Sequence, residues 1–143
     1  MFLATSLLIS ASISAGLKGK QETVQTTAGR ALMARIYQPK GPGPFPTLLD
    51  LHGGAWNNKD RFANEPMDRA LAASGLLVVA IDLTLALEAH YPASLQDASF
   101  GIRWLKSHAA QWNGSAKSLG VLGRSTGGHV AELLGMQPNY PVG

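Results

Sequence analysis

The stretch that decides the fold is SLGVLGRSTGGHVAELLGM, residues 118–136. Residues 118–123 are mainly apolar and end at a glycine, a pattern typical of a short buried strand. From residue 126 to residue 136 the apolar positions recur at helical spacing. The apolar residues that share one face of this helix are Val130, Leu133 and Leu134. The stretch therefore predicts a strand that turns directly into a helix at Ser125.

Two further strand and helix pairs precede this turn. TLLDLHGG, which starts at Thr47, predicts a strand that ends in a glycine pair, and LLVVAID, residues 76–82, predicts a strand buried on both faces. A helix is expected from about Asn64 to Gly75, with Met67, Ala70 and Leu71 facing inward. A second helix is expected from Ser94 to about Ala110.

The expected start of the second helix is a capping box formed by Ser94 and Asp97. Before all of these elements, residues 22–38 predict an antiparallel hairpin. The alternation of strands and helices along the chain predicts an α/β fold. The expected sheet is mostly parallel, with an antiparallel entry hairpin and helices on both faces.

Composition excludes several classes of protein. The chain has 143 residues, no cysteine and a net charge of +3 without a basic stripe, so neither disulfides nor nucleic-acid binding is expected. No His, Asp and Glu cluster has metal-ligand spacing, and no cofactor is expected. Residues 1–20 form either a signal peptide or an N-terminal helix, and residues 21–143 form the domain. With a signal within residues 1–16 the protein would be secreted or periplasmic, and otherwise cytoplasmic; no membrane span is expected.

The turn at Ser125 has the pattern G-x-S-x-G, in which a serine hydroxyl stands exposed between a strand and a helix. A serine nucleophile needs N–H donors for the oxyanion that develops during its attack. Thr126 at the helix start and the glycine pair Gly53 and Gly54 can bring such donors to one point.

Five motifs, LHGGAW, VVAIDLTLALE, YPASLQD, IRWLK and GRSTGGHVAELL, together resemble the α/β-hydrolase fold. The similarity is to its hormone-sensitive-lipase-like esterase branch and covers about residues 35–134. The resemblance implies that Ser125 is the nucleophile, that Gly53, Gly54 and Thr126 form the oxyanion hole, and that the substrate is a small carboxylic ester.

The chain departs from this branch in three places. The third glycine of the oxyanion loop is Ala55, a substitution that leaves the backbone donor intact. The branch commonly reads Asp-Tyr-Arg-Leu-Ala-Pro-Glu where residues 82–88 read DLTLALE, which leaves the packing of this rim loop open. The family's catalytic acid and histidine come from later strands, and no position here inherits either role. We therefore expect an incomplete, truncated α/β-hydrolase domain whose last strand is an open edge available for self-association.

Three functional hypotheses follow. The first is the N-terminal part of a serine ester hydrolase, the second a non-catalytic ligand-binding or interaction protein, and the third an unusual dyad of Ser125 with His90. The other histidines and acidic residues considered are expected to have structural roles. His52 is expected to brace the glycine loop, His129 to point back toward the sheet, and Asp82 and Asp97 to anchor loop and helix ends.

Overall fold

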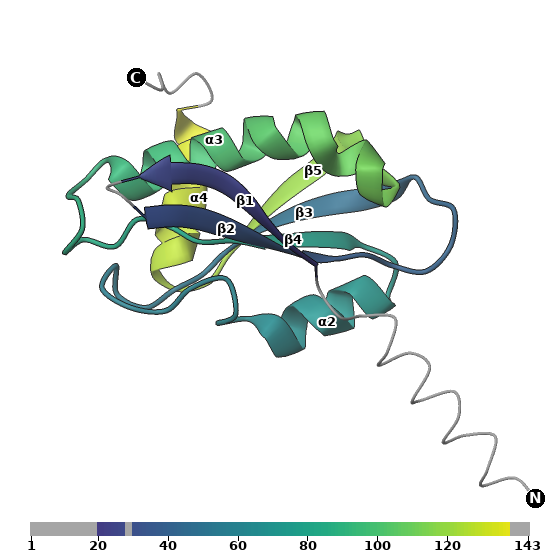
Figure 1. Cartoon of the computed structure of the whole chain (residues 1–143), viewed down its shortest axis with the longest axis horizontal. Helices are drawn as coiled ribbons and strands as arrows, with labels where there is room; N and C mark the ends of the chain where they lie inside the picture. Colours follow the sequence, from purple (N-terminus) through teal and green to yellow (C-terminus); the bar gives the residue numbers. More distant parts are fainter. Residues whose placement is uncertain (1–19, 28–29, 138–143) are drawn as a thin grey trace, which may run out of the picture.

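The computed structural model describes residues 20–27 and 30–137 of the chain (Figure 1). The stretch interpreted as a signal or an N-terminal helix therefore lies outside the described residues, except for Lys20. The elements are β1 (Lys20–Thr27), β2 (Arg30–Tyr37), β3 (Phe45–Leu51), α2 (Glu65–Ala73), β4 (Leu77–Ile81), α3 (Ala93–His108), the 3₁₀ helix η1 (Ala109–Trp112), β5 (Gly114–Gly123) and α4 (Thr126–Met136). Among the described residues no helix is long and apolar enough to span a bilayer.

The sheet has five strands in the order β1-β2-β4-β3-β5. β1 and β2 form an antiparallel hairpin, β2 pairs antiparallel with β4, and β3 lies parallel to both β4 and β5. Helix α2 covers one face of the sheet, and α3 and α4 cover the other (Figure 1). The predicted fold class is thus confirmed. β5 is the last strand in the order, and self-association through it stays a prediction.

Alternating residues of the central strands supply the two cores. Leu49 and Leu51 of β3 are fully buried in the core shared with α3 and α4. Val78 and Ala80 of β4 face the other way, into the smaller core beneath α2. The alternation holds because successive side chains of a strand point to opposite faces of the sheet.

The prediction for the buried face of α2 was right for Leu71, which packs against the smaller core, and wrong for Met67 and Ala70. Met67 is 37% exposed and Ala70 is also exposed, whereas Asp68 and Ala72 are buried. The buried face is selected by a polar contact: the Asn64 amide, just before the helix, donates to both carboxylate oxygens of Asp50 in β3 at 3.1 and 3.0 Å. This contact turns Asp68, four residues after Asn64, toward the sheet as well.

The predicted capping box of α3 was also wrong. The helix begins at Ala93, and its N-cap residue, Pro92, makes no side-chain capping bond. Asp97 instead accepts a hydrogen bond from the backbone N–H of Thr84 at 2.7 Å. The carboxylate thus satisfies a buried loop amide, which would be unfavourable if left without an acceptor.

The last strand, β5, starts at Gly114, four residues earlier than predicted. Gly114 pairs with Phe45 across an irregular register, and the Ser115 N–H donates to the Thr47 hydroxyl at 3.1 Å. The helix after it runs from Thr126 to Met136 as predicted. The turn at Ser125 is therefore placed at the end of a strand that runs parallel to β3.

Candidate active site

Ser125 lies in the turn between β5 and α4 with φ 54° and ψ −121°, and it is exposed. A positive φ is unfavourable for a residue with a Cβ atom and persists only where the surroundings enforce it. Those surroundings are two glycines. A Cβ on Gly123 would collide with the carbonyl of Gly127, and a Cβ on Gly127 would collide with the carbonyl of Leu51. The strained serine is therefore held by backbone contacts that only glycine permits.

The glycine loop after β3 lies against this turn. A Cβ on Gly53 would sit 3.1 Å from the Cβ of Ser125 and 2.9 Å from the Arg124 carbonyl oxygen. Gly54, with φ 110°, accepts hydrogen bonds from the N–H groups of Asn57 and Asn58 at 3.0 and 3.2 Å. The structure thus brings together the two segments that the sequence analysis singled out separately.

Thr126 is the first residue of α4, a position whose N–H has no acceptor within the helix. Its side chain, His52 and Gly53 line one small hollow. The start of the helix and the glycine loop therefore face a common space. The positive end of the helix dipole favours negative charge at this point.

His52 braces the glycine loop, as expected. It is 3% exposed; its Nδ1 lies 2.7 Å from the Gly53 carbonyl oxygen, and the Leu83 N–H approaches its Nε2 at 3.3 Å. Because Nε2 faces a donor, it acts as the acceptor and Nδ1 carries the proton. The ring thereby ties the glycine loop to the rim loop.

The rim loop, residues 82–88, is anchored by Asp82. Its carboxylate is 3% exposed and accepts hydrogen bonds from the Arg61 side chain at 3.0 and 2.9 Å and from the Arg61 backbone N–H at 3.1 Å. The Met33 N–H donates to it from the neighbouring strand at 3.1 Å. Arg61 thus supplies a cation for this loop, in which the esterase branch commonly carries its own arginine.

His129 does not point back toward the sheet, so that expectation was wrong. It is exposed and lies edge-on to Trp56 with ring centroids 6.0 Å apart. Val130 and Leu134 are buried on the sheet-facing side of α4, and His129 lies on a different side of the helix. His90 and His129 both line a pocket of about 330 Å³. The backbone N–H of His129 donates to the Ser125 carbonyl oxygen at 3.2 Å, and among the described residues no side-chain hydrogen bond joins Ser125 to either histidine.

Sequence reasoning missed a buried acidic cluster beneath α2, formed by Asp50, Asn64 and Asp68. Burial raises the pKa of Asp50 to about 6, although the hydrogen bonds from Asn64 oppose this shift. Burial, followed by the charges of Asp50 and Glu65, raises the pKa of Asp68 to about 8. Asp50 within the apolar run TLLDL was the one available signal. In the described part of the chain no three metal-binding side chains gather at one point.

The comparisons with known proteins identify the family and the fold of the chain. The family model BD-FAE matches residues 35–141. Carboxylesterase NlhH of Mycobacterium tuberculosis is 29% identical over 120 residues, which are 82% of this chain and 38% of NlhH. The chain therefore spans well under half of the length of this relative.

Two solved structures are similar in fold. Esterase LipW of Mycobacterium marinum has a TM-score of 0.75 and 30% identity, over 90% of this chain and 42% of LipW. The hyperthermophilic esterase of the archaeon Pyrobaculum calidifontis has a TM-score of 0.77 and 25% identity, over 91% of this chain and 44% of that esterase. The chain belongs to the BD-FAE family, in the esterase branch of the α/β-hydrolase fold.

Proposed function

We propose that the protein hydrolyses carboxylic esters through an acyl-enzyme formed on Ser125. The observation that carries this proposal is the strained, exposed serine with the glycine loop packed so closely against it that a Cβ atom on Gly53 would lie 3.1 Å from the Cβ of Ser125. Backbone strain at an exposed nucleophile is retained where it serves the reaction. The names of the relatives, carboxylesterase and esterase, support the same reaction class.

In this reaction the Ser125 hydroxyl attacks the ester carbonyl carbon and the carbonyl oxygen becomes an oxyanion. The backbone N–H groups of Gly53, Gly54 and Thr126 would stabilise that charge. The alcohol leaves with a proton, and water then releases the acid and regenerates Ser125. We assign the base and its acidic partner to no described residue, because His52, Asp82 and Asp97 are engaged in holding loops.

The test is the Ser125→Ala variant of the intact protein. We expect hydrolysis of 4-nitrophenyl acetate to fall by roughly 10³-fold or more, and labelling by a fluorophosphonate to disappear. Ser118→Ala, on the exposed part of β5, is the matched control and should retain both. Hydrolysis that is unchanged by Ser125→Ala would refute the proposal. An intact protein that binds esters without turnover or labelling would favour the ligand-binding hypothesis instead.

A further inference from the structure

The first turn of α3 carries a serine whose hydroxyl the fold does not use. Ser94 follows the first residue of the helix, Ala93, and no side chain caps this helix start. The Ser94 side chain is half-buried, and its hydroxyl makes no hydrogen bond to a described residue. A serine hydroxyl can both donate and accept a hydrogen bond. This capacity is therefore available to a ligand.

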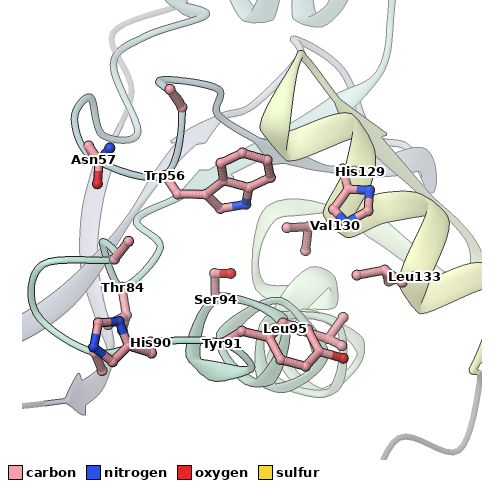
Figure 2. A pocket seen from close by; sticks show the side chains of 13 residues that line it. Trp56, Asn57, Thr84, His90, Tyr91, Ser94, Leu95, His129, Val130 and Leu133 are labelled. Atoms are coloured by element: carbon pink, nitrogen blue, oxygen red, sulfur yellow. The ribbon is translucent and has the colours of Figure 1, made fainter.

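Ser94 lies where two spaces meet. One is the pocket of about 330 Å³ between the glycine loop, the rim loop, α3 and α4, and the other is the small hollow beside Gly53 and Thr126. Ser94 lines both spaces. Figure 2 shows its hydroxyl inside the pocket, between Trp56 and Leu95.

The other residues that line both spaces offer no accessible hydroxyl. Among the described residues, those shared by the pocket and the small hollow are Trp56, Thr84, Ser94 and Val130. The Thr84 hydroxyl is fully buried, in contrast to the half-buried side chain of Ser94. Ser94 is therefore the residue that can offer a hydroxyl at the boundary of the two spaces.

The two spaces differ greatly in size. The small hollow has a volume of about 10 Å³, which is close to the space of one water-sized group. In the proposed reaction it would hold the carbonyl oxygen of the ester, beside the donors of Gly53 and Thr126. The larger pocket is within the size range of small-molecule sites. A substituent that continues from the reacting carbonyl into the pocket would pass Ser94 within its first carbons.

We propose that Ser94 is a specificity-determining residue, whose hydroxyl hydrogen-bonds an uncharged oxygen carried one or two carbons from the reacting ester group. This inference rests on the proposed function. Among the described residues that line the pocket there is no lysine, arginine, aspartate or glutamate, so a charged substituent would be buried without compensation. A site that offers a hydrogen bond to a substrate hydroxyl discriminates against the analogue that lacks it.

The acyl side is tested with pairs of methyl esters of similar shape, hydrolysed by the intact protein. Methyl 2-hydroxybutanoate is paired with methyl 2-methylbutanoate, and methyl 3-hydroxybutanoate with methyl 3-methylbutanoate. The measured quantity is kcat/KM for the hydroxyl ester divided by kcat/KM for its methyl partner. Ser94→Ala should lower this ratio roughly three- to tenfold for at least one pair, because the variant loses one neutral hydrogen bond.

The alcohol side is tested in the same way with 2-hydroxyethyl acetate and propyl acetate. The series in which Ser94→Ala lowers the ratio identifies the side of the ester that carries the oxygen. Differences in intrinsic reactivity between the paired esters cancel, because the wild type and the variant hydrolyse the same compounds. A general loss of activity also leaves the ratio unchanged, so the ratio reports recognition alone.

Ser107→Ala is the matched control. Ser107 lies on the same helix, is exposed, donates its hydroxyl to the Arg103 carbonyl oxygen at 3.2 Å and does not line the pocket. This variant should leave every ratio unchanged. If Ser94→Ala lowers kcat/KM for all esters by one common factor, or changes no ratio, the inference is wrong.

Binding without turnover separates this inference from the proposed function. In the Ser125→Ala protein, followed through the NMR signal of the Trp56 indole N–H, adding Ser94→Ala should weaken at least one hydroxyl ester three- to tenfold. The binding of its methyl or propyl partner should not change. If this is observed but no ester is hydrolysed by the wild type, the proposed function fails and recognition by Ser94 stands. If esters are hydrolysed through Ser125 and Ser94→Ala changes no ratio, the inference fails and the proposed function stands.

Discussion

Asp68 should make the stability of this protein fall as pH rises. Its side chain is fully buried, and neither carboxyl oxygen has a hydrogen-bond partner among the described residues. Its pKa is raised from 3.8 to about 8, so the folded chain keeps a proton that the unfolded chain releases. Because the folded state binds more protons within this window, the free energy of unfolding decreases from about pH 4 to about pH 8 and levels off on either side.

The size of this effect follows from the shift. One proton retained on folding changes the free energy of unfolding by about 1.4 kcal/mol per pH unit. At pH 7, roughly three units above the unfolded pKa, the accumulated loss from Asp68 is about 4 kcal/mol. The pKa of Asp50, raised to about 6, adds to the loss with the same sign between about pH 4 and pH 6.

The variant Asp68→Asn keeps the shape of the side chain and cannot titrate. The cost of burying the amide is independent of pH. Between pH 5 and pH 7 the free energy of unfolding of the variant should therefore rise by about 3 kcal/mol relative to that of the wild type. Urea unfolding at pH 5, 6 and 7 measures this difference. Asp60→Asn, which changes an exposed carboxylate, should follow the wild type at every pH.

Parallel stability curves for the wild type and Asp68→Asn would show that Asp68 carries no raised pKa and would refute the reasoning. If the variant does not fold, the ¹³C NMR titration of the Asp68 carboxyl in the wild type gives the answer directly. A midpoint near 4 would contradict the role assigned to burial.

Two other predictions concern the turn and the rim loop. Gly127→Ala should destabilise the fold by about 2 kcal/mol or more, because the new Cβ meets the carbonyls of Leu51 and His52. Gly135→Ala in the same helix meets nothing within 4 Å and should stabilise by about 1 kcal/mol, so similar urea midpoints for the two would contradict the packing. Arg61→Met should cost about 3 kcal/mol, because it leaves the buried Asp82 carboxylate without its ion pair. If thermal unfolding shows that Arg61→Met lowers the free energy of unfolding by less than about 1 kcal/mol, the ion pair with Asp82 contributes little.

The turn at Ser125 could be predicted from sequence because it depends on backbone contacts. Gly123, Gly127 and Gly53 each face a neighbouring main chain too closely for a Cβ atom, and that requirement is visible in the sequence as a glycine. The strands were predictable for a related reason, since a continuous apolar run between turn residues leaves few alternatives to a buried strand.

The wrong predictions for α2 and α3 have a different cause. Each involves a polar side chain whose hydrogen-bond partner is distant in sequence. Asn64 reaches Asp50 fourteen positions away, and this contact places Asp68 on the buried face of α2. Asp97 satisfies the loop amide of Thr84 thirteen positions away, so it was not available to cap α3. Local spacing contains no information about such pairs.

The pocket between the glycine loop, the rim loop, α3 and α4 could not be predicted from the sequence. Its walls come from four separate segments, which neither hydrophobic periodicity nor a single motif places next to one another. The rim loop DLTLALE, which departs from the esterase branch, supplies one of those walls. The turn and its glycine loop match the branch and the rim loop does not.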